Sequence, residues 1–569
     1  MNEYIRYPAV LKYYNLFMDK RFTYPLLIVL LGSLAFIPFL GDVHLFDWDE
    51  INFAESAREM LATGDYTTVR INYLPFWEKP PLFIWFQAIS MHFFGVNEMA
   101  ARLPNAICGI VTLMIIYSIG CKLYNERFGL LWVMAYIGSI LPFFYFKFGI
   151  IDPWFNLFIF LSIYFLIRFQ HRQNNAEAWM FIILSAAASG LGVMTKGPVA
   201  ILLLALTAGV YLLIHRFRFP VKWYHITVFI LVLSLVGGIW FILLLINGNY
   251  SVIKDFISYQ IDLFRTQGAD HGGFLFYHFI VLYLGVFPAS ILALLSGQKV
   301  SDETALQKDF KLWMVILFWV VLILFTVVNT KIIHYSSMCY FPITYLAAWA
   351  VYYISNQEIS FKASARYSLV VVSIFYTILA FAVSQIDIIK TYLLQYNLIQ
   401  DEFVKGNLQA VAGWNGWEWF PAVLLPSGVF ACLYYTRNKL YANGFGILFF
   451  FTMLFTFFSM MLLLPRIEAY SQRAVIDFYK SLKGKDCYVE RAGFKSYANL
   501  FYFQKPPVSQ FDPHDYDRLS QGSLDKPLYI VMKANDKKDL LSKNPKWNII
   551  YERNGFVFCI RNPEKLNDQ

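Results

Sequence analysis

Three carboxylates stand close together near the start of the chain, at Asp47, Asp49 and Glu50. They follow an apolar stretch and precede a segment with helical periodicity. A carboxylate beside a reacting hydroxyl can act as a general base, so Asp49 and Glu50 are candidate catalytic residues. The alternative is structural: Asp49 would only cap the following helix, and its neighbours would be solvated loop charges.

Two lysines are candidates for binding an anionic group. Lys79 follows Glu78 directly before a short apolar segment, where an ammonium near the lipid headgroups can hold a phosphate as a point charge. Lys196 interrupts a long apolar stretch, where a charge is a functional candidate by default. The alternatives are a lysine whose stem lies along lipid and a plain turn at residues 195–198.

Further polar residues stand at the mouths of apolar stretches. Asp152 precedes Pro153, where a carboxylate among apolar neighbours needs a partner or a task, although Asp before Pro is equally a good helix start. A polar loop holds Arg265 and His271. His271 is a candidate metal ligand, although a single histidine is more often solvated. Tyr335, next to His334, supplies a further donor.

The composition predicts that most of the chain is solvated by lipid. Of its 569 residues, 58% are hydrophobic and 15% are charged, and the mean hydropathy is +0.49, which a water-soluble surface does not tolerate. The net charge of +9 fits Lys and Arg in cytoplasmic loops, so no nucleic-acid partner is expected. Four of the six cysteines are interpreted as small buried hydrophobes, whereas Cys487 and Cys559 in a polar tail leave a disulfide open.

The apolar stretches predict a polytopic membrane protein. A helix of about 20 apolar residues crosses a bilayer, and about thirteen such spans are expected. They lie at residues 22–41, 104–121, 127–144, 152–168, 178–195, 197–214, 224–246, 275–295, 311–329, 335–354, 366–385, 417–436 and 444–464. Lys and Arg fall on alternate loops, which places the N-terminus in the cytoplasm. With an odd number of spans, the loops carrying the candidate residues and the polar tail all lie outside.

The fold class is therefore an all-α polytopic membrane protein with a small C-terminal α/β extracytoplasmic domain. Residues 1–464 form the predicted transmembrane domain and residues 465–569 the outer domain, in which four short β-like runs occur. The first outer loop, residues 42–103, holds two interfacial helices. One begins at Asp49, which is placed to cap it, and the other runs from Leu82 to Phe94.

All of these candidate residues fall on one side of the membrane, whereas unrelated surface charges should favour neither side. One mechanism uses the whole set: cations hold a lipid phosphate, carboxylates deprotonate an acceptor, and the surface helices shape a cavity open to the bilayer. Glycosyl transfer fits, because neutralising the departing phosphate stabilises the charge that grows as the glycosidic bond breaks. A base opposite that leaving group gives inversion at the anomeric carbon.

The motifs also resemble a known family. Asp49-Glu50, the run from Ala54 to Leu61, Glu78-Lys79-Pro80-Pro81-Leu82 and the stretch 95–104 resemble the aminoarabinose transferases, bacterial lipid A modifying enzymes related to protein O-mannosyltransferases and sharing the GT-C fold. The resemblance is strongest over the first 110 residues. It continues through Asp152, the segment 195–198 and the segment 331–342, and it thins out in the tail.

The resemblance implies specific roles. Asp49 would be the catalytic carboxylate, and Asp152 a second acid near the sugar or acceptor. Glu78 would organise the site through a divalent metal, the candidate cofactor. The donor phosphate would be bound by Lys79, Lys196 and Tyr335. The chain departs from the family at residues 259–265, where a Glu-His pair followed by Arg is common. This departure leaves the metal, and Arg265 as a phosphate ligand, open.

We therefore expect an inverting glycosyltransferase in the bacterial inner membrane with its active site on the periplasmic face. Its donor would be a sugar, for example 4-amino-4-deoxy-L-arabinose, on undecaprenyl phosphate. Its acceptor would be lipid A or another envelope lipid, or alternatively a protein Ser or Thr. A lipid or sugar transporter is a rival, but it should carry charges at mid-bilayer depth and two related halves, which this sequence lacks. A noncatalytic envelope scaffold would tolerate replacement of Asp49.

Overall fold

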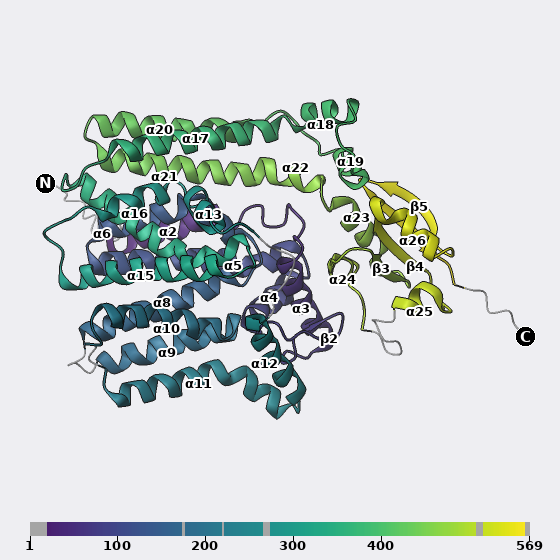
Figure 1. Ribbon diagram of the computed structural model, residues 1–569, viewed down its shortest axis with the longest axis horizontal. Coiled ribbons are helices and arrows are strands. Elements are labelled where there is room, and N and C mark those ends of the chain that lie inside the picture. The colour runs from purple at the N-terminus through teal and green to yellow at the C-terminus, as the bar shows by residue number, and fades with distance from the viewer. Residues whose placement is uncertain (1–19, 173–176, 219–220, 266–272, 508–515, 564–569) are drawn as a thin grey trace, which may run out of the picture.

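The protein is a bundle of long helices with a small mixed sheet at one end (Figure 1). The computed structural model describes residues 20–172, 177–218, 221–265, 273–507 and 516–563. The first half of the bundle contains α2 (Lys20–Phe36), α5 (Glu98–Leu123), α6 (Glu126–Ile137), α7 (Ile140–Phe144), α8 (Asp152–His171), α9 (Glu177–Lys196), α10 (Val199–Ile214) and α11 (Trp223–Ile246). The second half contains α13 (Tyr277–Gly285), α14 (Ala289–Ala293), α15 (Ala305–Val327), α16 (Tyr340–Ser355), α17 (Ala363–Ser384), α20 (Phe420–Arg437) and α21 (Tyr441–Phe458), which a π turn joins to α22 (Leu464–Ala469).

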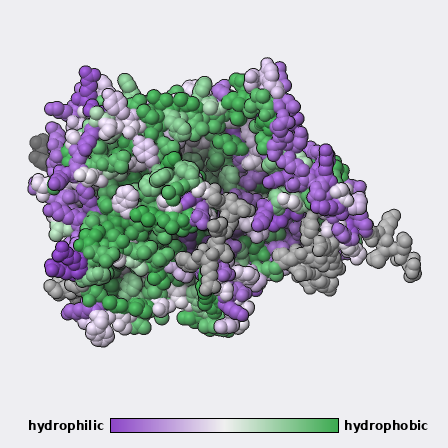
Figure 2. Space-filling view, in the orientation of Figure 1, coloured by the Kyte–Doolittle hydropathy of each residue, from purple (hydrophilic) through white to green (hydrophobic). Residues whose placement is uncertain are grey.

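The helices confirm a multi-pass membrane protein. Each of the predicted spans overlaps a helix of the structure. Among the described residues, seven helices are long and apolar enough to cross a membrane, or nine if each of two bent pairs counts as one span. The total of thirteen spans therefore stays a prediction. Apolar residues cover the middle of the bundle, and hydrophilic residues gather at both of its ends (Figure 2). This is the surface that a lipid-embedded bundle needs.

Two of the predicted straight spans are bent, which corrects the sequence interpretation. The helices at 126–137 and 140–147 meet at 82°, and those at 277–285 and 289–297 meet at 104°. At the first bend, a Cβ on Gly138 would lie 2.6 Å from Met134 O and from Phe449, so the close approach of the chain to α21 requires glycine. The second bend contains Pro288, which cannot donate a helical hydrogen bond.

The first outer loop folds against one end of the bundle. It contains α3 (Asp49–Thr63), the hairpin of β1 (Arg70–Ile71) and β2 (Leu74–Pro75), and α4 (Leu82–Phe94). Gly64 and Gly95 end the two helices with positive φ, as the sequence predicts. Beside this loop lies α12 (Tyr250–Arg265), whose Phe256 packs against Trp240 of α11. These short helices lie at the end of the bundle that faces the sheet (Figure 1).

The C-terminal segment forms a four-stranded sheet in the order β3-β4-β6-β5, with β3 parallel to β4 and the other pairs antiparallel. Its elements are β3 (Tyr488–Ala492), β4 (Leu528–Lys533), β5 (Asn548–Arg553), β6 (Phe556–Arg561), α23 (Arg473–Leu482), α24 (Ala498–Phe503), α25 (Tyr516–Gln521) and α26 (Lys537–Lys543). All four predicted strands are present. Cys487 and Cys559 are free thiols. The domain boundary at residue 465 stays a prediction.

The first outer loop and the C-terminal segment share one apolar core. Phe53 of α3 and Phe83 of α4 belong to the same buried cluster as Phe478, Phe501 and Phe558 of the C-terminal elements. The short helix α19 (Glu402–Leu408) packs on this core through Phe403, and α18 (Ile386–Gln395) lies at the end of α17 (Figure 1). The sheet is therefore packed onto the loop that carries the candidate carboxylates.

Candidate active site

His334 joins the two candidate acids. Its Nε2 lies 3.3 Å from Asp49 Oδ2 and 3.8 Å from Asp152 Oδ2. Asp49 opens α3, Asp152 opens α8, and His334 lies in the 3₁₀ segment Ile333–Cys339. The structure thus brings together three segments that are separated by hundreds of residues. The sequence predicted that Asp49 and Asp152 would meet and named His334 among the outer donors, but it did not place the histidine between the two acids.

The 3₁₀ segment is itself held in place by a short hydrogen-bond relay. Asn156, one turn along α8 from Asp152, donates to Ser337 Oγ at 2.8 Å. Ser337 Oγ in turn donates to the His334 carbonyl at 2.5 Å. Because Asp152 and Asn156 lie on one face of α8, the helix that carries the acid also fixes the backbone of the histidine.

A cation completes this cluster. Lys196, the last residue of α9, donates to Asp152 Oδ1 at 2.6 Å. Its Nζ also lies 5.2 Å from the ring centroid of Tyr335 and 5.5 Å from that of Phe155. Asp152 is only 2% exposed, and this pairing supplies the partner that a buried carboxylate needs. The candidate residues Asp152, Lys196 and Tyr335 are therefore in one place.

Asp49 does not cap its helix, which corrects the structural alternative drawn from the sequence. The N-cap position is Trp48, and no side-chain capping bond is made there. Burial opposes ionisation of Asp49, but the hydrogen bond and charge of His334, with the charges of Lys79 and Lys196, outweigh it and lower the pKa of Asp49. Asp49 is thus an ionised carboxylate whose side chain remains 36% exposed, so a substrate can reach it.

Lys79 and Glu78 border the same site. Burial, followed by the charge of Lys196, lowers the pKa of Lys79 against the opposing effect of Glu78. An ammonium in this position can bind a phosphate as a point charge, alongside the carboxylates that surround it. Burial raises the pKa of Glu78, which also accepts a hydrogen bond from Tyr259 of α12. Burial and the surrounding carboxylates raise the pKa of Tyr335, so its hydroxyl stays a donor.

Glu50 has a different role from the catalytic one predicted. It is 3% exposed, and its two oxygens accept from Arg102 Nε at 2.7 Å and Arg102 Nη2 at 2.9 Å. The backbone N–H groups of Gly149 and Phe46 donate to the same oxygens at 2.6 and 2.9 Å. A carboxylate enclosed in this way offers no face to a reactant. We assign it to positioning the 46–50 segment, which sets the direction of Asp49.

The C-terminal segment closes over the site from the other side. Ser496 donates to Asp47 Oδ2, and the backbone N–H of Tyr497 lies 3.4 Å from Asp47 Oδ1. The Tyr497 ring stacks on Trp48 with centroids 5.0 Å apart. Ser496 and Tyr497 were not singled out in the sequence, because no local pattern relates positions 47 and 496.

A second group of buried charges lies farther along α3. Arg58 donates from Nε and Nη2 to the two oxygens of Glu55, each at 2.7 Å. Burial and the adjacent Glu55 raise the pKa of Glu59 to about 9, so Glu59 is protonated at neutral pH. Glu59 accepts from the backbone N–H of Tyr73 at 2.8 Å, and the Tyr73 hydroxyl donates to Lys505 O at 2.6 Å. This group ties α3 to the hairpin and to the C-terminal segment.

Two of the predicted ligands cannot be placed at the site. Arg265 ends α12, but its side chain is not among those described, and His271 lies outside the described residues. Within the described ranges, no group of three or more His, Cys, Asp and Glu side chains is arranged to hold a metal ion. Glu78 and Asp49 alone do not supply the ligands that a divalent cation needs, so a metal at Glu78 stays a prediction.

A family model and two sequence relatives match this chain. A family model described as dolichyl-phosphate-mannose-protein mannosyltransferase matches residues 78–240, a range that includes Lys79, Asp152 and Lys196. Two curated relatives are each called undecaprenyl phosphate-alpha-4-amino-4-deoxy-L-arabinose arabinosyl transferase, the second with the suffix 1. The protein from Pectobacterium carotovorum is 26% identical over 57% of this chain and 58% of its own length. The protein from Proteus mirabilis is 26% identical over 59% of this chain and 60% of its own length. The matched regions thus span less than two thirds of these relatives.

The solved structures share the whole fold. ArnT from Cupriavidus metallidurans, in its structure bound to undecaprenyl phosphate, superimposes with a TM-score of 0.74 over 95% of this chain and 98% of its own, at 18% identity. Its apo structure gives the same values. The fold and the site therefore define a polytopic membrane protein of GT-C architecture with acids and cations gathered at one end of its bundle. Within that class, the resemblance to the GT-C aminoarabinose transferase family that the N-terminal motifs indicated is confirmed.

Proposed function

We propose that this protein is an inverting membrane glycosyltransferase that moves a sugar from undecaprenyl phosphate to an envelope lipid. The observation that carries the proposal is the cluster of Asp49, His334, Asp152 and Lys196, with Lys79 beside it. Such a cluster combines an ionised, accessible carboxylate with a cationic wall. The donor named for the relatives, undecaprenyl-phosphate-linked aminoarabinose, carries a phosphate that these lysines can bind.

The donor phosphate is bound in this proposal by the ammonium groups of Lys79 and Lys196 and by the hydroxyl of Tyr335. As the bond between the anomeric carbon and the phosphate oxygen breaks, negative charge grows on the departing undecaprenyl phosphate. Preorganised cations stabilise that charge more in the transition state than in the ground state, which is the condition for catalysis. Arg265 at the end of α12 remains a further candidate for this role.

Asp49 acts from the opposite side of the sugar. The acceptor oxygen attacks the anomeric carbon, and the proton of an acceptor hydroxyl passes to the Asp49 carboxylate, so that configuration inverts. His334 holds Asp49 ionised and directed at the acceptor. Asp152 positions Lys196 through their 2.6 Å contact, as a second acid near the sugar. An acceptor phosphate would need little help from a base, whereas an acceptor hydroxyl depends on it.

The site would lie on the periplasmic face of the bacterial inner membrane, with the N-terminus in the cytoplasm. The supporting argument is the distribution of Lys and Arg on alternate loops. In Figure 1, α3 and α4 lie with the C-terminal sheet at one end of the bundle, and Asp49 opens α3, which supports a single outer face. Lipid A is the first candidate acceptor, because the aminoarabinose transferases that the N-terminal motifs resemble modify lipid A, and the curated relatives are named arabinosyl transferases.

A second candidate function is protein O-mannosyltransferase-like transfer to Ser or Thr. It is favoured by the family model over residues 78–240, whose description names a protein acceptor. The two candidates share the donor chemistry, so residues that touch the phosphate cannot distinguish them. The acceptor itself has to be identified.

The decisive experiment compares the glycosylation of lipid A and of secreted proteins by mass spectrometry. Three strains are needed: one with the intact chain, one with Asp49→Asn and one without the chain. We expect a sugar on lipid A only with the intact chain. As a matched control, Asp42→Asn alters an exposed acid in the same loop and should leave the product unchanged. Equal product from the Asp49→Asn strain would refute the assignment of the base.

A further inference from the structure

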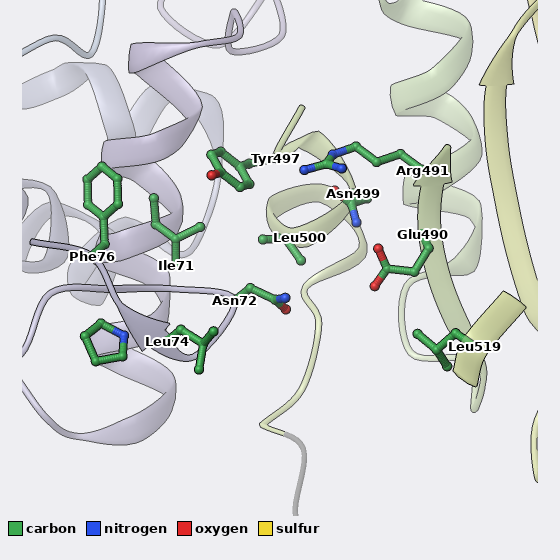
Figure 3. A pocket seen from close by; sticks show the side chains of 11 residues that line it. Ile71, Asn72, Leu74, Phe76, Glu490, Arg491, Tyr497, Asn499, Leu500 and Leu519 are labelled. Atoms are coloured by element: carbon green, nitrogen blue, oxygen red, sulfur yellow. The ribbon is translucent and has the colours of Figure 1, made fainter. Parts of the chain in front are cut away.

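A cavity of about 390 Å³ lies between the β1–β2 hairpin and the C-terminal sheet, outside the cluster of acids and lysines. Its walls carry amide, carboxylate and guanidinium groups together with apolar side chains. The cavity is lined by Asn72, Leu74 and Phe76 on the hairpin side and by Glu490, Arg491 and Asn499 on the sheet side. In Figure 3, Asn72 and Glu490 extend from opposite walls into the same space, and Arg491 reaches across toward Tyr497.

Two polar groups of this cavity are poised for a ligand. Asn499 is 3% exposed, and although its Nδ2 donates to Val489 O at 3.4 Å, its Oδ1 has no hydrogen-bond partner among the described residues. A buried acceptor left in this state costs free energy until a donor reaches it. Arg491 donates from Nε to Ser496 O and lies 5.8 Å from the Tyr497 ring centroid, but it makes no ion pair within the described ranges.

The cavity is connected to the catalytic segment. Its residue Tyr497 stacks on Trp48, which directly precedes Asp49. Its residue Phe76 stands two positions before Glu78. The cavity therefore neighbours, through Trp48 and Phe76, the segments that carry Asp49 and Glu78. An acceptor bound in it would stand next to the segment that holds the proposed base.

Resting on the proposed glycosyltransferase function, we infer that this cavity binds the saccharide headgroup of the acceptor lipid, with Arg491 facing an anionic substituent of that headgroup. Sugar hydroxyls supply the donor that Asn499 lacks, and Leu74 and Phe76 pack against the apolar face of a ring. The volume is within the range of about 300–1,000 Å³ typical of small-molecule sites.

An extended peptide is a poorer occupant. A peptide would add to the outer edge of β3, which is one of the two edge strands of the sheet. The side chain of Asn499 already takes the carbonyl of Val489 on that strand. The cavity therefore favours a compact polyhydroxylated headgroup over a protein acceptor, and this selects the lipid acceptor of the proposed function.

The test measures binding to the purified full-length chain in detergent, apart from turnover. The probe is the deacylated, phosphorylated glucosamine disaccharide of lipid A, and undecaprenyl phosphate serves as a second, independent ligand. The variants are Arg491→Ala, Leu74→Trp, which fills the cavity without removing a polar group, and Arg553→Ala, a matched control at an exposed arginine of β5. We expect Arg491→Ala to weaken disaccharide binding at least about tenfold, as the loss of a charged hydrogen bond predicts. Leu74→Trp should weaken it because the larger ring excludes the headgroup from the cavity. Undecaprenyl phosphate binding should be unchanged in all three.

Other outcomes overturn the inference. Wild-type affinity for the disaccharide in both Arg491→Ala and Leu74→Trp would show that the cavity is not the headgroup site. Weaker undecaprenyl phosphate binding in Arg491→Ala would assign the cavity to the donor. Binding of a Ser/Thr peptide that depends on Arg491, in place of the disaccharide, would assign it to a protein acceptor. An intact chain that transfers no sugar would instead refute the proposed function, whatever the disaccharide does.

Discussion

Replacing His334 by Phe should impair transfer and also change its pH dependence. Phe keeps a ring of similar size but removes the N–H that contacts Asp49 at 3.3 Å and Asp152 at 3.8 Å. A hydrogen bond to a charged group contributes about 1.5–3 kcal/mol, and solvent at the half-open Asp49 side chain reduces it. The lower end of that range corresponds to a loss of about tenfold in kcat.

The acid limb of the pH profile provides a more specific readout. His334 is the main influence that lowers the pKa of Asp49 against the opposing effect of burial. Without it, burial prevails and the pKa of Asp49 rises. Because the ionised carboxylate is the active form, the pH at which kcat/KM falls on acidification should move upward in His334→Phe. His334→Gln, which retains a donor, should recover part of the loss.

The assay is transfer from undecaprenyl-phosphate-linked aminoarabinose to lipid A in proteoliposomes, followed over a range of acidic pH. His92→Phe, at an exposed histidine of α4, serves as the matched control. An acid limb at the same pH in His334→Phe and in the wild type would refute the reasoning, even if the rate fell, because the histidine would then act through structure alone.

Three further changes test the surroundings of the site. Asp152→Asn should lower the free energy of unfolding in detergent by about 3–5 kcal/mol, because it leaves the Lys196 ammonium without its partner. Adding Lys196→Met should restore that stability but not transfer. Arg102→Lys keeps the charge but loses the two-pronged contact with Glu50, so the midpoint of thermal unfolding should fall and transfer should decline as Asp49 loses its direction; an unchanged midpoint would contradict this positioning role. Glu59→Gln should be more stable than the wild type by about 3 kcal/mol at pH 7, because Glu59 holds its proton up to about pH 9 when folded whereas the unfolded chain releases it near pH 4.5. Wild-type stability should fall as pH rises between those two values and that of the variant should not, which thermal unfolding across this range will check.

Much of the helical fold and of the strand pattern follows from the sequence. Long apolar stretches must be helical in lipid, and alternating residues in the tail mark strands, so both were predicted close to their observed positions. The bends were not predicted. The sharp turn at Gly138 depends on how closely α21 approaches, which is a property of the packed bundle rather than of the local sequence.

The site was predicted in part for a similar reason. Assigning loops to one side of the membrane brought Asp49 and Asp152 together without any geometry. It could not separate Asp49 from Glu50, because adjacent residues of a helix point about 100° apart and only the position of Arg102 decides which is buried. One signal was present: an arginine within an apolar helix needs a buried partner. The contact of Asp47 with Ser496 joins positions 449 residues apart, and no periodic pattern reveals it.

The last long helix sets the distance between the membrane-spanning part of the molecule and the C-terminal sheet. From Tyr441 to Ala469 the chain runs as one helix of 29 residues, and its end is anchored where Glu468 meets His44 and Arg473 at 2.9 and 2.7 Å. The C-terminal sheet is therefore held at one distance from the apolar middle of the bundle. A ligand that arrives from the bilayer and a ligand held against the sheet would therefore meet at the same depth. A change in membrane thickness should shift both ligands together and leave their relative position unchanged.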